Sequence, residues 1–220
     1  MKISLTKRMK KFADLISKKK IADIGCDHGK ITAELFLKNK IDFAIVSDIS
    51  RPSAEKAKKL LENLGVKAFE MRVGDGLETI TKEDKIEAIL ISGMGGEEII
   101  KILSNSSLKF EEYILGPQHG ELLLKKYLVQ NGFKIVLDKT ILDGKYYNLI
   151  KCVPGQDERS EDDLILSPDN FENNEDFLSF LSYRKEKLDL ILKSNKDKQM
   201  ERELELTRNA LEYLKGKNNE

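Results

Sequence analysis

The chain has 220 residues, 40% of them hydrophobic and 35% charged, with a formal net charge of zero. This length suits one α/β core and a smaller appendage, since single domains commonly hold about 100 to 200 residues. No apolar run approaches the roughly 20 residues of a membrane span, and the N-terminus has no hydrophobic signal core, so we expect a cytoplasmic protein without a membrane partner. Cys26 and Cys152 are too few for a disulfide scaffold or a four-ligand zinc site, so we expect no metal.

The first 20 residues carry most of the asymmetry in charge. They contain eight Lys or Arg residues and a single acid, whereas residues 155–220 hold 11 basic and 17 acidic side chains. A basic arm beside a ligand site indicates a polyanionic partner. The candidates in this arm for contact with such a partner are Lys7, Arg8, Lys10 and Lys11. The alternative is an amphipathic helix whose apolar side turns inward and whose lysines are merely solvated.

Apolar strands alternate with amphipathic helices between residues 20 and 132. Strands are expected near residues 20–25, 43–48, 68–76, 85–93 and 111–117, and helices near residues 29–39, 52–65, 97–106 and 119–132. This alternation predicts a parallel sheet covered on both faces. Two further strands, at residues 133–142 and 145–153, flank the turn signal Asp143-Gly144 and predict a terminal antiparallel hairpin that closes the sheet.

The first expected strand runs into the sequence DIGCDHGK at residues 23–30. It is like a nucleotide-binding glycine loop, except that Asp27 stands where a dinucleotide site needs a second glycine. Its charge would repel a pyrophosphate by about 1 kcal/mol or more at close range. S-adenosylmethionine has no phosphate and carries an ammonium and a sulfonium, so Asp23, Gly25 and Asp27 suit this cofactor. The alternative is structural: Asp27 caps the next helix, and Asp23 is a buried acid at the end of a strand.

Acidic residues also follow the next two strands, at the edge where open α/β sheets bind ligands. Asp48, followed by Ile49, is placed to accept hydrogen bonds from both ribose hydroxyls. Asp75, between Gly74 and Gly76, is expected to accept the adenine amino group. Each acid alone is compatible with an ordinary loop, but three at successive strand ends predict an adenosyl site.

A second glycine loop, SGMGGEEI at residues 92–99, follows the fourth strand. Gly93, together with the glycines after Met94, would let a flat ring approach the backbone, and Met94 would supply a soft apolar wall for the acceptor base. The alternative is a tight turn with Met94 in the core. The candidates for a role near the transferred methyl group are Asp27, His28 and Met94.

The composition becomes acidic after Pro154. Residues 155–170 are predicted to form a linker without structure, and residues 171–220 an antiparallel helical hairpin with a coiled-coil seam. The seam positions are Phe177, Leu181, Arg184, Leu188 and Ile191 on one helix and Met200, Leu204, Thr207, Leu211 and Leu214 on the other. We therefore expect domains at residues 1–154 and 171–220, and truncation after Pro154 should leave a folded first domain.

The motifs ADIGCDHGKI, RVGDGLE, ISGMGGEEI and KYYNLIK together resemble the bacterial tRNA adenine-22 N1-methyltransferases, the TrmK family, between Ser4 and Pro154. The resemblance implies a class I, Rossmann-like methyltransferase fold, S-adenosylmethionine as donor and N1 of a D-arm adenine of tRNA as acceptor. Two stretches depart from the family. GPQ at residues 116–118 replaces the QPN of many members, and HGK at residues 28–30 replaces HAYL. The first departure leaves any base contact in that loop unassigned.

Adenine N1 is a lone-pair nucleophile at neutral pH, so methyl transfer needs alignment and desolvation more than a strong base. Asp27 or His28 could stabilise the cationic product or accept a proton, and their alternative roles are cofactor binding and helix capping. Arg51 and Arg72 are expected at the pocket rim as further RNA contacts. The alternatives left open are a methyltransferase for another RNA position or for a small molecule, and an RNA-binding scaffold without activity. The sequence does not predict the oligomeric state.

Overall fold

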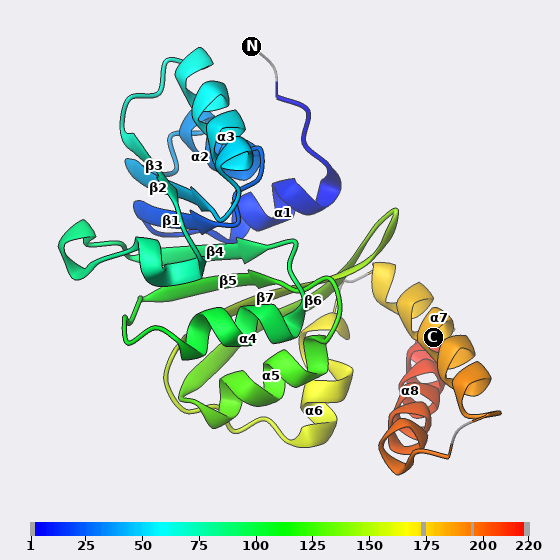
Figure 1. Cartoon of the computed structure of the whole chain (residues 1–220). Helices are drawn as coiled ribbons and strands as arrows, with labels where there is room; N and C mark the ends of the chain where they lie inside the picture. The colour runs from blue at the N-terminus through cyan, green and yellow to red at the C-terminus, as the bar shows by residue number, and fades with distance from the viewer. Residues whose placement is uncertain (1–2, 173–174, 195, 218–220) are drawn as a thin grey trace.

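A seven-stranded sheet in the order β3-β2-β1-β4-β5-β7-β6 forms the centre of the molecule in the computed structural model, which describes residues 3–172, 175–194 and 196–217 (Figure 1). Five neighbouring strands are parallel, whereas β7 runs antiparallel between β5 and β6. The strands are β1 (Lys20–Ile24), β2 (Phe43–Asp48), β3 (Phe69–Val73), β4 (Ala88–Ser92), β5 (Glu112–Gly116), β6 (Phe133–Asp143) and β7 (Lys145–Pro154). The predicted class of sheet is confirmed.

Helices cover both faces of the sheet, as Figure 1 shows. They are α1 (Lys7–Leu15), α2 (Lys30–Leu37) and α3 (Arg51–Asn63) on one face and α4 (Gly96–Ser104) and α5 (Glu121–Gln130) on the other. Strand β4 shows why both faces are apolar: Leu90 packs with α1 and α2, while Ile89 and Ile91 pack with α4 and α5. Successive side chains of a strand point to opposite faces, so a doubly covered strand is apolar throughout. Short 3-10 helices, η1 (Gly76–Thr79) and η2 (Lys82–Asp84), follow β3.

The predicted hairpin is formed by β6 and β7, which pair from Asp143 and Lys145 at the turn to Phe133 and Pro154 at the open end. Gly144 makes the turn with φ of +76°, a conformation that glycine adopts without a steric penalty. One irregularity interrupts the register between Ile135 and Leu137.

The segment 155–170 differs from the expected linker without structure. It contains α6 (Glu161–Leu166), which begins at a Ser160 capping box, and the 3-10 helix η3 (Pro168–Asn170). Leu164 joins the core on the face of the sheet that α4 and α5 cover. Ser167 is buried, and its hydroxyl oxygen lies 2.9 Å from the Lys125 ammonium nitrogen. The expectation of an unstructured linker is therefore wrong. It rested on the acidic composition of the segment, whereas the residues form a capped helix with one apolar side.

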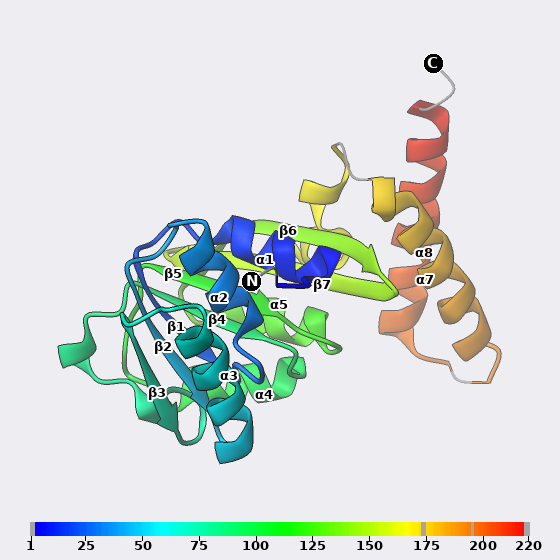
Figure 2. The ribbon, with the colours of Figure 1, turned by 90° about the horizontal axis from the view of Figure 1, so that it is seen from above.

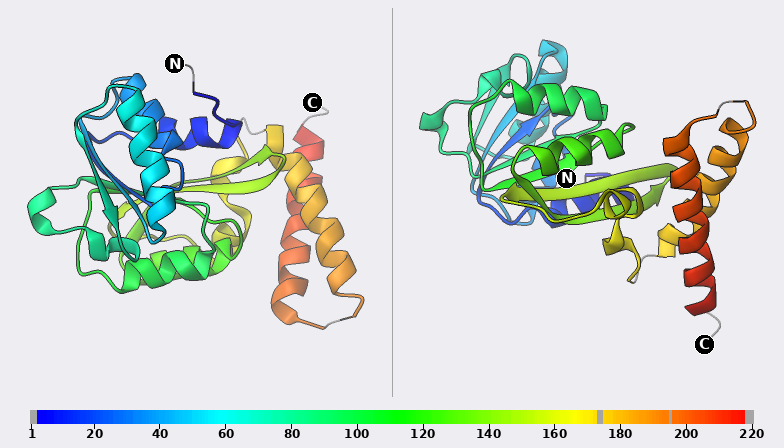
Figure 3. Two further views of the ribbon diagram at one scale, coloured as in Figure 1. Left: turned by 45° about the horizontal axis from the view of Figure 1, so that its top comes forward. Right: turned by 90° about the horizontal axis from the view of Figure 1, so that it is seen from below.

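The helices α7 (Glu175–Ile191) and α8 (Lys198–Lys217) form the predicted antiparallel hairpin, which extends from the turn end of β6 and β7 (Figures 2 and 3). Phe177, Leu181 and Leu211 are buried in its seam. The polar seam residue Arg184 bonds Glu203 at 2.9 Å and the backbone oxygen of Ile165 at 2.8 Å, so it fastens the hairpin to α6. No helix in the described ranges is both long and apolar enough to cross a membrane.

Candidate active site

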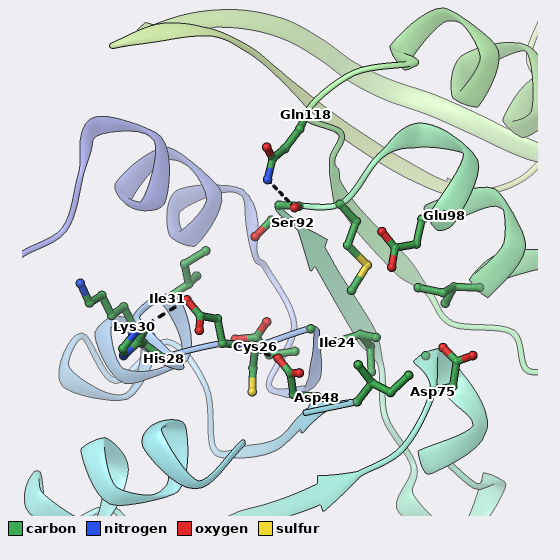
Figure 4. A pocket seen from close by; sticks show the side chains of 18 of the residues that line it. Ile24, Cys26, His28, Lys30, Ile31, Asp48, Asp75, Ser92, Glu98 and Gln118 are labelled. Atoms are coloured by element: carbon green, nitrogen blue, oxygen red, sulfur yellow. Dashed lines mark hydrogen bonds and ion pairs between the residues drawn. The ribbon is translucent and has the colours of Figure 1, made fainter. Parts of the chain in front are cut away.

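A cavity of about 530 Å³ opens at the carboxyl ends of the parallel strands (Figure 4). Every residue that the sequence predicts as cofactor-binding lies in its lining: Asp23, Gly25, Asp27, His28, Asp48, Ile49, Gly74, Asp75, Gly76, Gly93 and Met94. Parallel strands end at one edge of a sheet, so loops that are distant in the sequence meet there. The structure therefore brings these residues together, and their individual roles stay predictions.

The loop after β1 is fixed by backbone hydrogen bonds to β2. The N–H groups of Gly25 and Cys26 donate to the Ser47 oxygen at 2.8 and 3.0 Å, and the N–H of Asp27 donates to an Asp48 carboxylate oxygen at 3.1 Å. Gly25 and Asp27 have φ of +69° and +46°, and the left-handed region costs a residue with a Cβ about 1–2 kcal/mol. The strained Asp27 conformation directs one backbone donor toward Asp48 and fixes the position of that carboxylate.

Asp23 is the buried acid of the site, with 4% of its surface exposed and a 2.6 Å hydrogen bond from the Thr32 hydroxyl. Burial is the main cause that raises the pKa of Asp23 to about 6; the hydrogen bond from the Thr32 hydroxyl opposes this rise, and the charge of Asp48 adds to it. An incoming cation would favour the ionised form of this carboxyl group. Burial, and after it the charge of Asp23, also raises the pKa of the Cys26 thiol, so Cys26 is not an activated nucleophile.

Two further carboxylates line the side of the cavity formed by the loops after β2 and β3. Asp48 accepts a second bond from the Ser50 N–H at 2.8 Å, and Asp75 lies 3.5 Å from the ammonium of Lys101. Ile49 is 71% exposed beside Asp48 and offers an apolar surface at the cavity. Acceptors next to an apolar surface suit the ribose and adenine of an adenosyl group.

The loops after β4 and β5 form the opposite side. The Gly93 N–H donates to the Gly116 oxygen at 3.1 Å, and the Gln118 N–H donates to the Met94 oxygen at 2.8 Å. The side-chain nitrogen of Gln118 also donates to the Gly93 oxygen. Met94 packs partly against the core and also lines the cavity. Its contact with an acceptor base stays a prediction.

His28 and Asp27 lie together at the cavity, with 3.8 Å between the His28 Nε2 atom and an Asp27 carboxylate oxygen. Both side chains are exposed. This position leaves them accessible to a ligand, and nothing in their contacts assigns a proton-transfer role to His28.

The predicted RNA-binding residues differ in their position relative to the cavity. Arg8 lines the cavity, and its guanidinium lies 4.4 Å from the centre of the Tyr147 ring. Lys7 instead pairs with Asp176 at 2.6 Å. Lys10, Lys11 and Arg51 are exposed and lie outside the lining.

Arg72 is not at the rim of the cavity, where it was expected. Its guanidinium binds Glu70 and both carboxylate oxygens of Asp84, and the bonds to Asp84 are 2.6 and 2.7 Å long. The Arg72 hydrogen bond lowers the pKa of Asp84 to about 2. Its charge is therefore already matched within the η2 turn.

Several lining residues were not predicted as site residues from the sequence, among them Lys30, Ser92, Glu98 and Gln118. Figure 4 shows Glu98 and Gln118 at the cavity with Asp48 and Asp75. Gln118 follows β5, so the rule applied to the first four strands, that ligands lie at carboxyl ends, would have found it. Glu98 gives no comparable signal, because acids are ordinary in the first turn of a helix.

The groups that line the cavity fit S-adenosylmethionine. The sulfonium and ammonium groups of this cofactor are cations, and five carboxylates line the cavity, those of Asp23, Asp27, Asp48, Asp75 and Glu98. Among the described residues, no group of three or more His, Cys, Asp or Glu side chains could hold a metal ion. The sheet order, the glycine loop and the acidic strand ends together define a class I methyltransferase.

Residues 5–150 match the family model described as "Methyltransferase domain", and the chain belongs to this family. Several solved structures are similar over nearly the whole chain, among them the following three. TrmK of M. capricolum, in complex with S-adenosyl-homocysteine, is 25% identical with a TM-score of 0.84, covering 96% of this chain and 99% of that one. The m1A22 tRNA methyltransferase TrmK of B. subtilis is 26% identical with a TM-score of 0.75, covering 98% and 99%. A Streptococcus agalactiae protein of the NADB-Rossmann superfamily is 26% identical with a TM-score of 0.87, covering 96% and 99%. The predicted resemblance to TrmK is confirmed.

Proposed function

We propose that this protein transfers the methyl group of S-adenosylmethionine to N1 of adenine 22 in the D-arm of tRNA. The observation that carries the proposal is the cavity, which joins the glycine loop after β1 to Asp48, Asp75 and the Gly93–Met94 loop. The similarity to TrmK structures, one with the demethylated cofactor and one of an m1A22 enzyme, supports both the donor and the acceptor. Because tRNA is its substrate, we expect the protein to act in the cytoplasm.

The residues of the cavity act mainly by binding and orienting the cofactor and the target adenine. When bound, the cofactor supplies an electrophilic methyl group on a sulfonium. Asp48, held by two backbone donors, presents fixed acceptors for hydroxyl groups, and Asp23 supplies a buried carboxylate that a cation ionises. Preorganised groups of this kind cost little reorganisation during the reaction.

The acceptor needs no strong general base, because adenine N1 has a free lone pair at neutral pH. Methylation makes the ring cationic, and the carboxylates of Asp27 and Glu98 on the cavity wall supply the opposite charge. N1 lies on the Watson-Crick edge, so adenine 22 must leave any base pair to enter the cavity. Arg8 on the cavity wall and the exposed Lys10 and Lys11 on the same helix are suited to the tRNA backbone.

The test is methyl transfer from labelled S-adenosylmethionine to two tRNA transcripts that differ only at position 22. We expect labelling of the transcript with adenine and none of the transcript with guanine, because guanine N1 carries a proton and has no free lone pair. The Asp48→Ala variant serves as a control, since it removes the proposed ribose acceptor and should lose most of the activity. Equal labelling of both transcripts would contradict the proposal.

A further inference from the structure

The amide of Gln118 is held in one orientation at the mouth of the cavity. Its nitrogen donates to the backbone oxygen of Gly93, and its oxygen lies 3.5 Å from the ammonium of Lys145. An amide oxygen cannot face the Gly93 oxygen, and an amide nitrogen cannot accept from an ammonium, so both neighbours select the same orientation. Figure 4 shows the nitrogen directed to the loop after Ser92 and the oxygen turned away from that loop.

The Gln118 side chain lies on the side of the cavity that is formed by the loops after β4 and β5. This is the side at which we expect the base that accepts the methyl group. The loop that carries Gln118 is joined to the Gly93–Met94 loop by backbone hydrogen bonds of 3.1 and 2.8 Å, so its backbone position is fixed. The side chain itself is exposed and lines the cavity together with Met94. An exposed hydrogen-bond acceptor on a fixed backbone is suited to the specific recognition of a ligand.

The Watson-Crick edges of adenine and guanine differ in what they present to such an acceptor. Adenine carries an amino donor beside its N1 lone pair, whereas guanine carries the O6 acceptor beside a protonated N1. The oxygen of Gln118 would pair with the amino group and would face O6 as a second acceptor. Hydrogen-bonding sites discriminate strongly against partners that leave a polar group unmatched.

We propose that Gln118 is a specificity-determining residue whose side-chain oxygen accepts a hydrogen bond from the exocyclic amino group of the target adenine. The proposal rests on the proposed function. It assigns a base contact to the loop at residues 116–118, which the sequence left without one. Lys145 strengthens the assignment, because its ammonium keeps the oxygen from rotating toward Gly93.

The experiment is a double-mutant cycle between Gln118 and the amino group, measured as kcat/KM for methyl transfer. The protein is wild type or Gln118→Met, which is similar in length and has no oxygen. The tRNA carries adenine or purine riboside at position 22, and purine riboside keeps the N1 lone pair but has no amino group. We expect the wild type to prefer adenine and Gln118→Met to lose about 10-fold of that preference. Purine is also a weaker nucleophile, but this intrinsic difference is common to both proteins and cancels in the cycle.

Two further variants separate base recognition from a structural effect. Gln118→Glu keeps acceptor oxygens but cannot donate to the Gly93 oxygen, so its overall rate should fall while its preference for adenine persists. Gln130→Met, the same substitution on the exposed end of α5, should match the wild type in both respects. Binding of the two tRNAs in the presence of S-adenosyl-homocysteine, measured by fluorescence anisotropy, should show the same coupling without turnover.

If the effects of Gln118→Met and of the missing amino group simply multiply, Gln118 only joins two loops and the inference is wrong, while the proposed function stands. If the wild type does not methylate the tRNA with adenine at position 22, the proposed function itself fails. The two failures are therefore distinguishable in one set of measurements.

Discussion

The side chain of Met94 lies so close to Gly25 that an ideal Cβ atom on Gly25 would be 2.2 Å from the Met94 terminal methyl carbon. The loops after β1 and β4 therefore touch across the cavity, and the absence of a side chain at residue 25 allows this contact. Gly25 also has φ of +69°, which a residue with a Cβ adopts only with strain.

Gly25→Ala is therefore expected to weaken cofactor binding by displacing Met94 into the cavity. Gly65→Ala is the matched control, because Gly65 has φ of +75° but no atom within 4 Å of an added Cβ. Both variants should lose about 1 kcal/mol of stability from backbone strain in thermal unfolding. Only Gly25→Ala should lose affinity for S-adenosyl-homocysteine in calorimetry, by about 10-fold or more. Equal affinities of the two variants would show that the contact with Met94 does not shape the site.

The raised pKa of Asp23 predicts a pH-dependent stability. The unfolded chain releases this proton near pH 3.8, whereas the folded protein holds it until about pH 6. Between these two pH values the folded state binds more protons than the unfolded state. The free energy of unfolding therefore falls as the pH rises through this range. Asp23→Asn removes the ionisation, so its stability relative to wild type should rise by up to about 3 kcal/mol between pH 4 and pH 7. Urea unfolding at several pH values measures this difference, and parallel pH profiles would refute it.

The buried pair of Lys125 and Asp138 moves the expected boundary of the first domain. Their 2.9 Å ion pair is almost fully buried, and Ser167 completes it at 2.9 Å from the Lys125 ammonium. Truncation after Pro154 removes Ser167 and the core residue Leu164, so we now expect residues 1–154 to be destabilised by more than about 3 kcal/mol.

A longer fragment, residues 1–172, keeps this network and should unfold cooperatively and bind the cofactor product. Circular dichroism and calorimetry on the two fragments measure the difference. A stable fragment 1–154 would restore the boundary expected from the sequence.

Charge removal on α1 should weaken tRNA binding. Lys10→Ala with Lys11→Ala removes two exposed charges near Arg8 and should flatten the dependence of log affinity on log salt by about one to two units. Lys67→Ala with Lys109→Ala is the control, since these exposed lysines precede β3 and β5 at the sheet edge opposite the cavity. Lys7→Ala should have a smaller effect, because Lys7 is already paired with a carboxylate. Filter binding at several salt concentrations checks this, and equal losses in the test and control variants would exclude α1 as a tRNA contact.

Much of the fold follows from the sequence because its signals are local. Continuous apolar strands, amphipathic helices and the turn at Gly144 each depend on neighbouring residues. The cavity was predictable for a related reason: strand ends in a parallel sheet share one edge, so Asp23, Asp48 and Asp75 must lie near each other.

Contacts between distant residues could not be predicted in this way. Asp138 and Ser167 lie 13 and 42 residues from Lys125, and no local pattern marks them as its partners. Arg72 looks like a free cation in the sequence, and only the fold of the η2 turn brings Asp84 to it. The acidic composition of residues 155–170 likewise led to the expectation of a linker. The capping box at Ser160 is the local signal that indicates the helix in this segment.

The position of the transferred methyl group in the tRNA tests the proposed function most directly. Unmodified tRNA is incubated with the full-length protein and S-adenosylmethionine, digested with a specific nuclease and analysed by mass spectrometry. We expect N1-methyladenosine at position 22 and no methylation elsewhere in the tRNA. Methylation at another position, on guanine, or only on a small molecule would contradict it.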